Sequence, residues 1–417
     1  MTRAAKAAKA RRAYDVVLFG ATGFVGRQTV AYFAEQAHGL RWALAGRSRA
    51  KLEQLRTACG AGAAQAGIVV ADAADTQALQ TLAAQTAVVL STAGPFALHG
   101  SALVAACVAE RTHYVDITGE TPWVRGLIDR HHAQAARDGT RIIPCCGFDS
   151  VPSDLGAWLV VRAIHRQFGE PCVSVKACHS IRGGINGGTL ASVFNLMDSG
   201  QTKLLADPFL LNPQSGPRRS VVGHADPVGP RHDADFDAWL GPFVMGLINT
   251  RVVRRSAALF GTRGDAGYAD DFAYQEYLRV GRGPLAAGAA AALSLGMGVG
   301  SFALSMKPWR ALVRTLVPAP GKGPSEGSMD GGSFRCELVG KSASGKQVRG
   351  LVAGQGDPGN RATTRFVCEA AMALASQLDA LPGGPAAGGV LTPVSGLGGV
   401  LAQRLLAVGM TLEPALA

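Results

Sequence analysis

Residues 20–26 read Gly-Ala-Thr-Gly-Phe-Val-Gly and stand between an apolar run, Asp15 to Phe19, and a helical pattern, Gly26 to Glu35. Glycines between a strand and a helix permit a tight turn and bring backbone N–H groups against a pyrophosphate at the positive end of the helix. The stretch therefore predicts a dinucleotide-binding turn at the start of a parallel sheet. Its expected contact residues are Gly20, Thr22, Gly23, Phe24, Val25 and Gly26.

The pattern continues outward from this turn as short apolar runs that alternate with helical stretches. Such alternation is typical of βαβ units and predicts a doubly wound α/β domain. We expect helices over Lys51 to Cys59, Thr76 to Ala84 and Ser101 to Glu110. Six strands are expected, at Asp15 to Phe19, Trp42 to Ala45, Ile68 to Ala71, Ala87 to Ser91, His113 to Asp116 and Arg141 to Pro144.

The end of the second expected strand indicates which dinucleotide is bound. A carboxylate there would bind the ribose 2′-hydroxyl of NAD, whereas the sequence has Arg47 and Ser48, with Lys51 one turn later. A guanidinium suits bidentate recognition of a phosphate, so NADP(H) is favoured over NAD(H). At the carboxyl edge of the sheet, Asp72 is expected beside the adenine, with a capping or turn aspartate as the alternative. A small-residue loop there lets the cofactor pass close to the backbone, at Ala93, Gly94 and Pro95.

Reduction by such a cofactor needs a proton donor, and no residue stands out as one. None of the six tyrosines has lysine four positions on, which disfavours the Tyr-x-x-x-Lys chemistry of carbonyl reductases. The candidates at the expected strand ends are His99, Tyr114, Asp116, Glu120, Cys146 and Asp149. A helix-start histidine and turn or cap carboxylates are alternative readings, and Ser153 or Asp154 is expected to N-cap a helix from Asp154 to Arg166.

The pattern divides the chain into four parts. We expect a basic disordered leader over residues 1–13, the nucleotide-binding domain over 14–150, a substrate or dimerisation α+β domain over 151–354, and a C-terminal helical segment over 355–417 that packs on the first domain. An antiparallel hairpin is expected from Ser333 to Ala353.

Residues 285–306 carry no charge and are flanked by arginines and a lysine. Twenty-two residues would cover a hydrocarbon layer of about 30 Å, but most of them are Ala, Gly and Ser, which gain little from lipid. Three interpretations stay open: a buried or dimer-contacting helix, a shallow contact with an anionic membrane surface, and a true span.

Composition limits the other classes. The formal charge of +11 includes five basic residues in the first 14, and no basic run is interleaved with aromatics, so nucleic acid is not an expected partner. The eight cysteines show no CxxC spacing, which predicts no metal site and fits a reducing cytoplasm. Hydrophobic residues make up 47%, enough for a large core.

The sequence resembles the saccharopine dehydrogenase-like oxidoreductases, and in particular their trans-acting enoyl reductase branch. The matching segments beyond the glycine turn include residues 45–48, 91–96, 114–120, 146–154 and 187–192. The resemblance implies a Rossmann-type sheet joined to a second, mixed α/β domain, with C-terminal helices returning to the first.

It also implies an NADPH-dependent oxidoreductase that reduces an enoyl group of a lipid- or polyketide-linked acyl substrate, either free or carrier-bound. Two alternatives remain: a saccharopine dehydrogenase-like enzyme acting on an amino-acid adduct, and a non-catalytic nucleotide-binding protein at a lipid surface. An adduct with several carboxylates would need several cations, and near the glycine-rich segment 183–188 only Lys176 and Arg182 are available.

Overall fold

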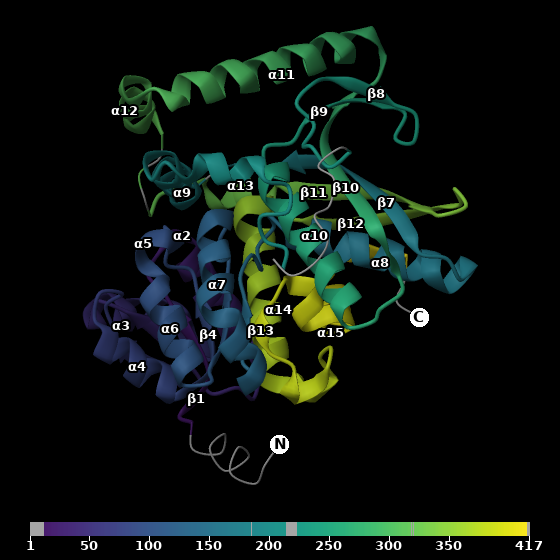
Figure 1. Ribbon diagram of the computed structural model, residues 1–417. Helices are drawn as coiled ribbons and strands as arrows, with labels where there is room; N and C mark the ends of the chain where they lie inside the picture. The colour runs from purple at the N-terminus through teal and green to yellow at the C-terminus, as the bar shows by residue number, and fades with distance from the viewer. Residues whose placement is uncertain (1–11, 185, 214–222, 318, 320, 415–417) are drawn as a thin grey trace.

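The computed structural model describes residues 12–184, 186–213, 223–317, 319 and 321–414, so residues 1–11 of the expected leader lie outside the described part. Figure 1 shows two units stacked one above the other. The elements of the first unit are β1 (Tyr14–Phe19), α2 (Phe24–Gln36), β2 (Trp42–Gly46), α3 (Arg49–Ala58), β3 (Gly67–Val70), α4 (Thr76–Ala84), β4 (Thr86–Ser91), α5 (Phe96–His99), α6 (Ser101–Ala109), β5 (His113–Asp116), α7 (Thr121–Asp138) and β6 (Arg141–Ile143). Arg12, expected in the leader, donates hydrogen bonds to the Glu110 carbonyl at 2.7 Å and the Thr112 hydroxyl at 2.8 Å, so order begins before Tyr14.

The first sheet confirms the expected doubly wound fold. It is parallel, with the order β13-β6-β5-β4-β1-β2-β3, which places the reversal of strand order between β1 and β4. The seventh strand, β13 (Gly389–Val390), pairs with β6 and was not expected, because two residues in a Gly/Pro-rich stretch show no strand pattern. Ligands of open parallel sheets bind at the carboxyl edge near the reversal.

The second unit is built on a mixed sheet. Its elements are α8 (Val151–Phe168), β7 (Cys172–Arg182), α9 (Gly187–Asp198), β8 (Arg231–Asp233), β9 (Ala238–Pro242), α10 (Gly246–Thr262), β10 (Tyr268–Gly281), α11 (Gly283–Ser305), α12 (Lys307–Leu316), α13 (Glu326–Asp330), β11 (Ser333–Ser342) and β12 (Gln347–Gln355). The order is β14-β12-β11-β7-β10-β9-β8, with β7 and β10 parallel and β11 and β12 forming the expected hairpin.

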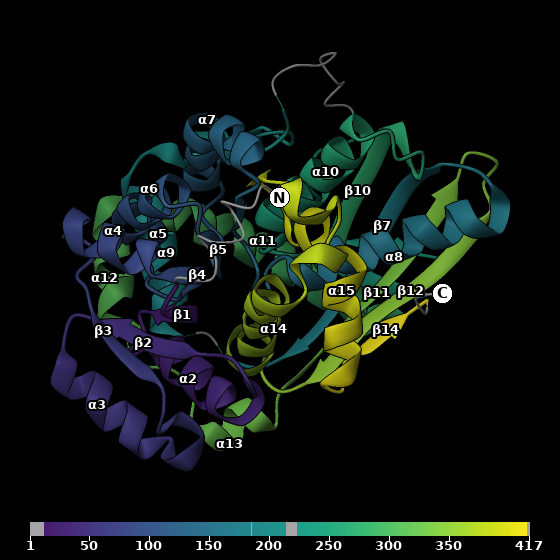
Figure 2. The same cartoon turned by 90° about the horizontal axis from the view of Figure 1, so that it is seen from below.

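The C-terminal segment ties the two units together, which confirms the expected return to the first. Its elements are α14 (Thr363–Ser376), α15 (Pro393–Ala407) and β14 (Thr411–Glu413). Helix α14 packs on α2 and on strands of the first sheet, while β14 pairs with β12 in the second. In Figure 2, α14 and α15 lie between the two sheets. The hydroxyl of Tyr32 donates to Glu369 at 2.7 Å across this contact.

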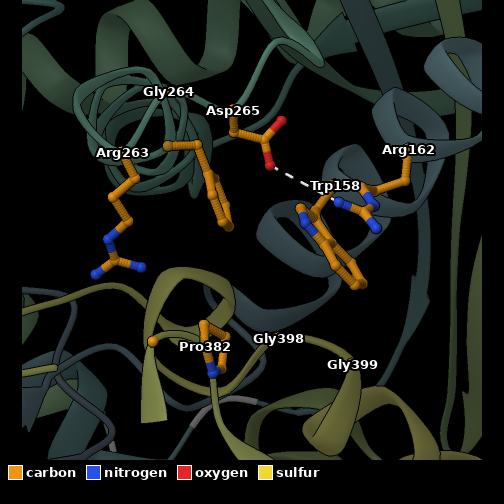
Figure 3. Close-up of a pocket in the computed structure, with 10 residues that line it drawn as sticks. Trp158, Arg162, Arg263, Gly264, Asp265, Pro382, Gly398 and Gly399 are labelled. Atoms are coloured by element: carbon orange, nitrogen blue, oxygen red, sulfur yellow. Dashed lines mark ion pairs between the residues drawn. The ribbon is translucent and has the colours of Figure 1, made fainter. Parts of the chain in front are cut away.

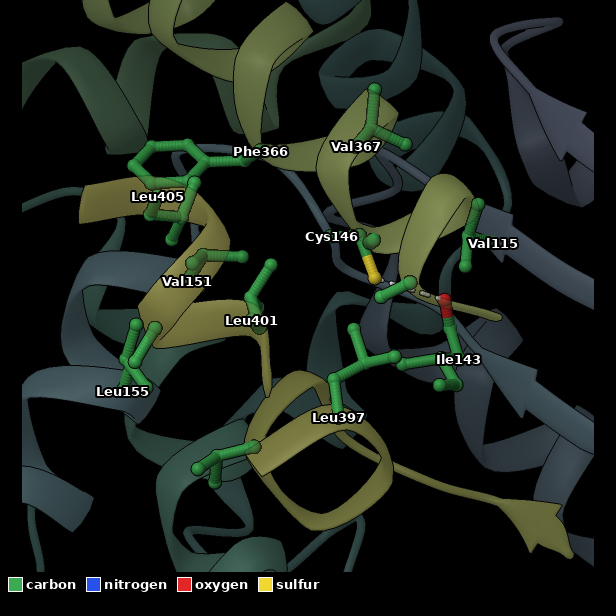
Figure 4. Packing of buried hydrophobic residues seen from close by; sticks show 14 of the residues in the cluster. Val115, Ile143, Cys146, Val151, Leu155, Phe366, Val367, Leu397, Leu401 and Leu405 are labelled. Atoms are coloured by element: carbon green, nitrogen blue, oxygen red, sulfur yellow. Dashed lines mark hydrogen bonds between the residues drawn. The ribbon is translucent and has the colours of Figure 1, made fainter. Parts of the chain in front are cut away.

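One large hydrophobic cluster runs through this junction. Figure 4 shows side chains from β5, β6, α8, α14 and α15 packed together, including Val115, Ile143, Phe366 and Leu401. Cys146 belongs to this core, fully buried, with its thiol 3.3 Å from the carbonyl of Ile143. The two units therefore pack against each other and are not separate domains joined by a flexible linker.

Helix α8 begins three residues earlier than expected, at Val151, and the expected cap was wrong. Neither Ser153 nor Asp154 caps it. The Asp154 carboxylate instead accepts from the backbone N–H of Val394 at 2.9 Å and from the Ser256 hydroxyl at 2.5 Å. It thereby holds the start of α15, a contact between residues 240 positions apart that no local pattern reveals.

Helix α11 covers almost all of the uncharged stretch, and it is not a buried core helix. It is the one helix among the described residues that is long and apolar enough to cross a membrane, yet only 11% of that window is buried. Figure 1 shows it lying along the outside of the second unit, far from the first sheet. Only Ala286 and Ala290 are buried, so the interpretation as a core helix is wrong.

Candidate nucleotide and substrate site

The glycine turn is packed too closely for any other residue at two of its positions. Gly20 follows β1 with φ +83°, and a Cβ there would lie 2.9 Å from the backbone nitrogen of Ala93. A Cβ at Gly26 would lie 2.8 Å from the Ala21 carbonyl carbon and closer still to the carbonyl oxygen of Gly20. The turn, the first helix and the loop after β4 are therefore in backbone contact.

This geometry fits a pyrophosphate. The N-cap of α2 is Gly23, which has no side chain to satisfy the first-turn N–H groups of the helix. These groups carry the positive end of the helix dipole and lie beside the reversal of strand order. Thr22, Phe24 and Val25 belong to the same turn, with Val25 buried and the other two partly exposed. The structure thus brings the six expected turn residues together at one helix end.

The residues expected at the adenosine end lie at the carboxyl ends of β2 and β3. Arg47 directly follows β2, is exposed, and has no ion pair or hydrogen bond within the described residues. Ser48 caps α3 and accepts from the backbone N–H of Lys51, whose side chain is exposed. Asp72 uses one carboxylate oxygen to accept from the Ala74 N–H at 2.9 Å, as a turn aspartate does. A free guanidinium and a free ammonium remain to bind a 2′-phosphate.

The loop after β4 closes over the turn and is held by a residue from the next loop. Ala93 contacts Gly20, and Thr92 donates its N–H to the Phe19 carbonyl at 2.9 Å. Gly94 and Pro95 lead into the short helix α5. Glu120, buried, accepts from the N–H groups of Phe96 and Ala97 at 2.8 and 3.0 Å. The carboxylate therefore fixes the small-residue loop that sequence reasoning placed beside the cofactor.

Three of the candidate donors are in places where they hold structure. Tyr114 and Cys146 are fully buried, and burial raises the pKa of each well above its usual range. Asp116 is also buried and accepts from the backbone N–H groups of Thr118 and Cys145, each at 3.0 Å. His99 is exposed at the end of α5. None of these four combines access with a free proton.

Asp149 differs from them. Burial raises its pKa from the usual 3.8 to about 7, and no group within the described residues forms a hydrogen bond or ion pair with its carboxyl. The residue as a whole is partly exposed, and its carboxyl faces Gly119, where a Cβ would lie 3.5 Å from its Oδ2. Gly119 adjoins Glu120, which holds the loop at Gly94. The carboxyl of Asp149 is thus about half protonated at neutral pH and lies at the carboxyl edge of the first sheet, where ligands of open parallel sheets bind.

The second unit closes this edge through α9. Ser192 on α9 donates to Glu120 at 2.8 Å, and the N-terminus of α9 is capped by Asn186, which in turn donates to Asn360 at 2.9 Å. Lys176, expected near a substrate, is instead paired with Asp233 at 2.7 Å and with Asp235, so it is not free to bind one. Arg182 is exposed at the end of β7.

Sequence reasoning missed a buried polar cluster between helices α8 and α10 and the second sheet. Glu276 accepts from Ser153 at 2.8 Å, Asn249 at 2.7 Å and Tyr274 at 2.9 Å, and lies 3.4 Å from His179. Burial by itself lowers the pKa of His179, but the neighbouring Cys336 and Glu276 raise that pKa by more. The net result is a pKa of about 10. The alternating pattern of β7 and β10 is the only signal that these side chains face inward. The cluster joins α8 and α10 to the second sheet.

A separate surface cavity does not belong to the site. It measures about 400 Å³ and is lined by α8, the end of α10 with the loop after it, residues 382–383 and the middle of α15, with Trp158, Arg162, Asp265 and Gly398 among its residues. Figure 3 shows the Arg162–Asp265 pair, 3.8 Å apart, on its wall. No lining residue comes from the glycine turn or its neighbouring loops. No group of three His, Cys, Asp or Glu in the described part of the chain is placed to hold a metal.

Comparison with known proteins identifies the family. Residues 16–143 match the family model of the saccharopine dehydrogenase NADP binding domain. A Mycobacterium bovis protein named trans-acting enoyl reductase is 35% identical over 97% of this chain and 98% of its own. The chain belongs to this family. The corresponding Mycobacterium ulcerans protein is 36% identical over 97% of this chain, and a Mycobacterium tuberculosis relative reaches 37% over 96%.

The expected family and cofactor are confirmed. As a family member with an NADP binding domain, the protein is an NADP(H)-dependent oxidoreductase. Yeast saccharopine dehydrogenase (L-Glu forming) shares the fold over 95% of this chain, with a TM-score of 0.51 and 14% identity. At that identity the likeness concerns architecture and says nothing of the substrate.

Proposed function

We propose that the protein reduces the carbon–carbon double bond of an enoyl group on an acyl chain carried as a thioester by a polyketide or lipid synthase. The observation that carries the proposal is the full-length similarity to trans-acting enoyl reductases, together with a carboxyl that can deliver a proton at the nicotinamide edge. NADPH supplies a hydride when bound.

Asp149 is the proposed proton donor. Reduction of an enoyl thioester adds a hydride to the β-carbon and a proton to the α-carbon, so the protein must provide an acid at one face of the substrate. Burial raises the pKa of the Asp149 carboxyl to about 7, so about half of the molecules hold the proton at neutral pH, and the carboxyl has no partner within the described residues that would have to be released first. The N–H groups of α2 and the side chains of Arg47 and Lys51 hold the cofactor phosphates, which fixes the orientation of the reacting end.

An acceptor with several carboxylates fits this site less well. Lys176 is already neutralised by two aspartates, so of the two cations expected near an amino-acid adduct only Arg182 is free within the described residues. An acyl chain needs apolar wall rather than cations, and Ile248 lies directly against the Gly119 loop beside Asp149.

The test is turnover of NADPH with 2-enoyl thioesters on coenzyme A and on an acyl carrier protein. The product should be the saturated thioester, identified by mass spectrometry as the gain of two hydrogens. Asp149→Asn should lower kcat by about 100-fold, within the usual range for a general acid, while His99→Gln leaves it close to the wild-type value. Loss of turnover in His99→Gln and not in Asp149→Asn would refute the assignment of the acid, and turnover with lysine and a 2-oxo acid instead would refute the substrate.

A further inference from the structure

Helices α11 and α12 leave large apolar side chains exposed, and we name these side chains together the α11–α12 face. On α11 the exposed members are Leu285, Leu295, Val299 and Phe302, of which Leu295 and Phe302 are each 70% exposed. On α12 they are Trp309, Leu312 and Leu316. Soluble proteins seldom leave so many large apolar side chains in water, and exposed apolar surface of this size marks an interaction site.

The opposite side of α11 is already used. Ala286 and Ala290 are buried, and Leu293 packs so closely on β9 that a Cβ at Gly241 would lie 2.7 Å from its Cδ2. The helix is therefore attached lengthwise to the second unit, as Figure 1 shows, and its length of about 34 Å runs along the protein surface. In this arrangement α11 can lie in a surface plane, but it cannot cross a bilayer.

Charge indicates what covers the face. Residues 279–323 contain six cationic residues and no carboxylate. Four of the six are arginines that pair with Glu337, Asp237 or Asp198, and the other two, Lys307 and Lys322, have no partner within the described residues. Lys307, at the bend between the two helices, is exposed and has no partner within the described residues, and Trp309 beside it is 51% exposed. An apolar face with tryptophan and lysine at its boundary is the composition of a helix at the boundary between lipid headgroups and acyl chains. The charge around the face is therefore net positive, with two lysines that are unpaired in the described part of the chain, which is complementary to anionic lipid and disfavours contact with a second copy of the same face.

We propose that the α11–α12 face docks the protein on an anionic lipid bilayer, with both helices lying in the interface and the rest of the molecule in water. Leu285, Leu295, Phe302 and the apolar side of α12 enter the boundary region, and Lys307 meets the phosphates. The interaction is peripheral and reversible, because neither helix crosses the bilayer and the buried apolar area is limited to one side of two helices.

The docked face is linked to the catalytic edge. Arg310 pairs with Asp198 at the end of α9 at 3.1 Å, and Arg314 pairs with the same carboxylate. The other side of α9 reaches Glu120 through Ser192, and the chain after α12 returns to the glycine turn, where a Cβ at Gly323 would lie within 3.0 Å of the Phe24 ring. A membrane on this face would therefore lie next to the site, where a lipid-linked acyl chain could enter. The docking itself does not depend on the proposed reaction.

The test measures partition of the full-length protein onto vesicles of phosphatidylcholine alone and of phosphatidylcholine with one-third phosphatidylglycerol, by co-sedimentation. We expect partition onto the anionic vesicles that weakens as salt is raised, and weaker partition onto the neutral ones. Leu295→Ser combined with Phe302→Ser should weaken it by about tenfold or more, given the apolar area that each side chain removes from water. Both side chains are on the surface, so the fold should tolerate the change. The matched control is Leu406→Ser. Leu406 is an exposed leucine on α15, outside the α11–α12 face, so this variant should partition like the wild type.

Two further measurements distinguish a lipid surface from a second copy of the chain as the partner of the α11–α12 face. Brominated lipid should quench the fluorescence of the wild type more than that of Trp309→Phe, because Trp309 is the tryptophan on the face. Sedimentation without vesicles should give the same monomer mass for the wild type and the double variant. A wild-type dimer that the double variant dissociates would overturn the proposal in favour of a second copy. Equal partition of wild type and double variant, or none for either, would overturn it in favour of no lipid role.

Discussion

Gly26→Ala is the sharpest test of the glycine turn, because the added methyl meets backbone rather than flexible side chains. The new Cβ would lie 2.8 Å from the Ala21 carbonyl carbon and closer still to the Gly20 oxygen, whereas ordinary contacts begin at 3.4 Å. The start of α2 must therefore move by more than about 0.6 Å from the turn. Such overpacking costs about 1–3 kcal/mol of stability.

The same displacement spoils the phosphate site. If the N–H groups of the first helical turn lose about 1.4–2.8 kcal/mol of interaction with the pyrophosphate, NADPH affinity falls by about 10- to 100-fold. The assay is titration of NADPH fluorescence. Gly62→Ala is the matched control, since its Cβ would meet the backbone of Ala34 on the same helix, with the Ala34 carbonyl carbon at 2.9 Å, but at a distance along the helix from the turn. It should lose comparable stability and keep its affinity. Equal affinity losses in both variants would refute the turn as the phosphate site.

Four further outcomes are expected. Arg47→Ala should weaken NADPH binding by about tenfold and NADH binding hardly at all, since only NADPH has the 2′-phosphate; equal effects on both would contradict that role. The kcat of the wild type should fall as pH rises through about 7, because Asp149 then loses the proton it donates, and the profile of Asp149→Asn should lack this step. Asp154→Ala should reduce the free energy of unfolding in urea by about 2–4 kcal/mol, as it leaves the Val394 N–H without an acceptor, and Asp154→Asn by less. Gly298→Ala should raise the stability by about 0.5–1 kcal/mol in a thermal melt, since its Cβ would meet nothing within 4 Å in the exposed helix α11; a loss would show that the helix packs differently.

The sequence predicts those parts of the fold whose cause is local. Glycines at 20, 23 and 26 together with the alternation that follows are enough for the first sheet, because each βαβ unit carries its own strand and helix pattern. Strand β13 has two residues and takes its place only by pairing with β6. Asp154 looked like a cap of its own helix, but its two partners stand about 100 and 240 positions away in the chain. Such contacts are determined by the tertiary packing, so they cannot be predicted from local sequence patterns.

The same distinction decides which acidic side chain is chemically available. Burial raises the pKa of Asp116, Asp149 and Asp154 alike, to about 7. Asp116 and Asp154 oppose that effect by accepting backbone N–H groups, from Thr118 and Cys145 in one case and Val394 in the other, so each carboxylate is already occupied in holding a loop or a helix end. For Asp149, burial is the only effect on the pKa, and its side chain reaches the loop beside Glu120 without a partner of its own among the described residues.

A carboxyl that is desolvated and yet unpaired is destabilising for the folded state at neutral pH. Because the pKa is raised in the folded state, the free energy of unfolding falls as pH rises from about 4 towards 7. A buried carboxyl that lowers stability and holds no structure is expected at a catalytic site, where function outweighs stability. Asp149→Asn should therefore raise the free energy of unfolding at pH 8 while it lowers kcat. A variant that loses both would mean that the Asp149 carboxyl holds structure after all.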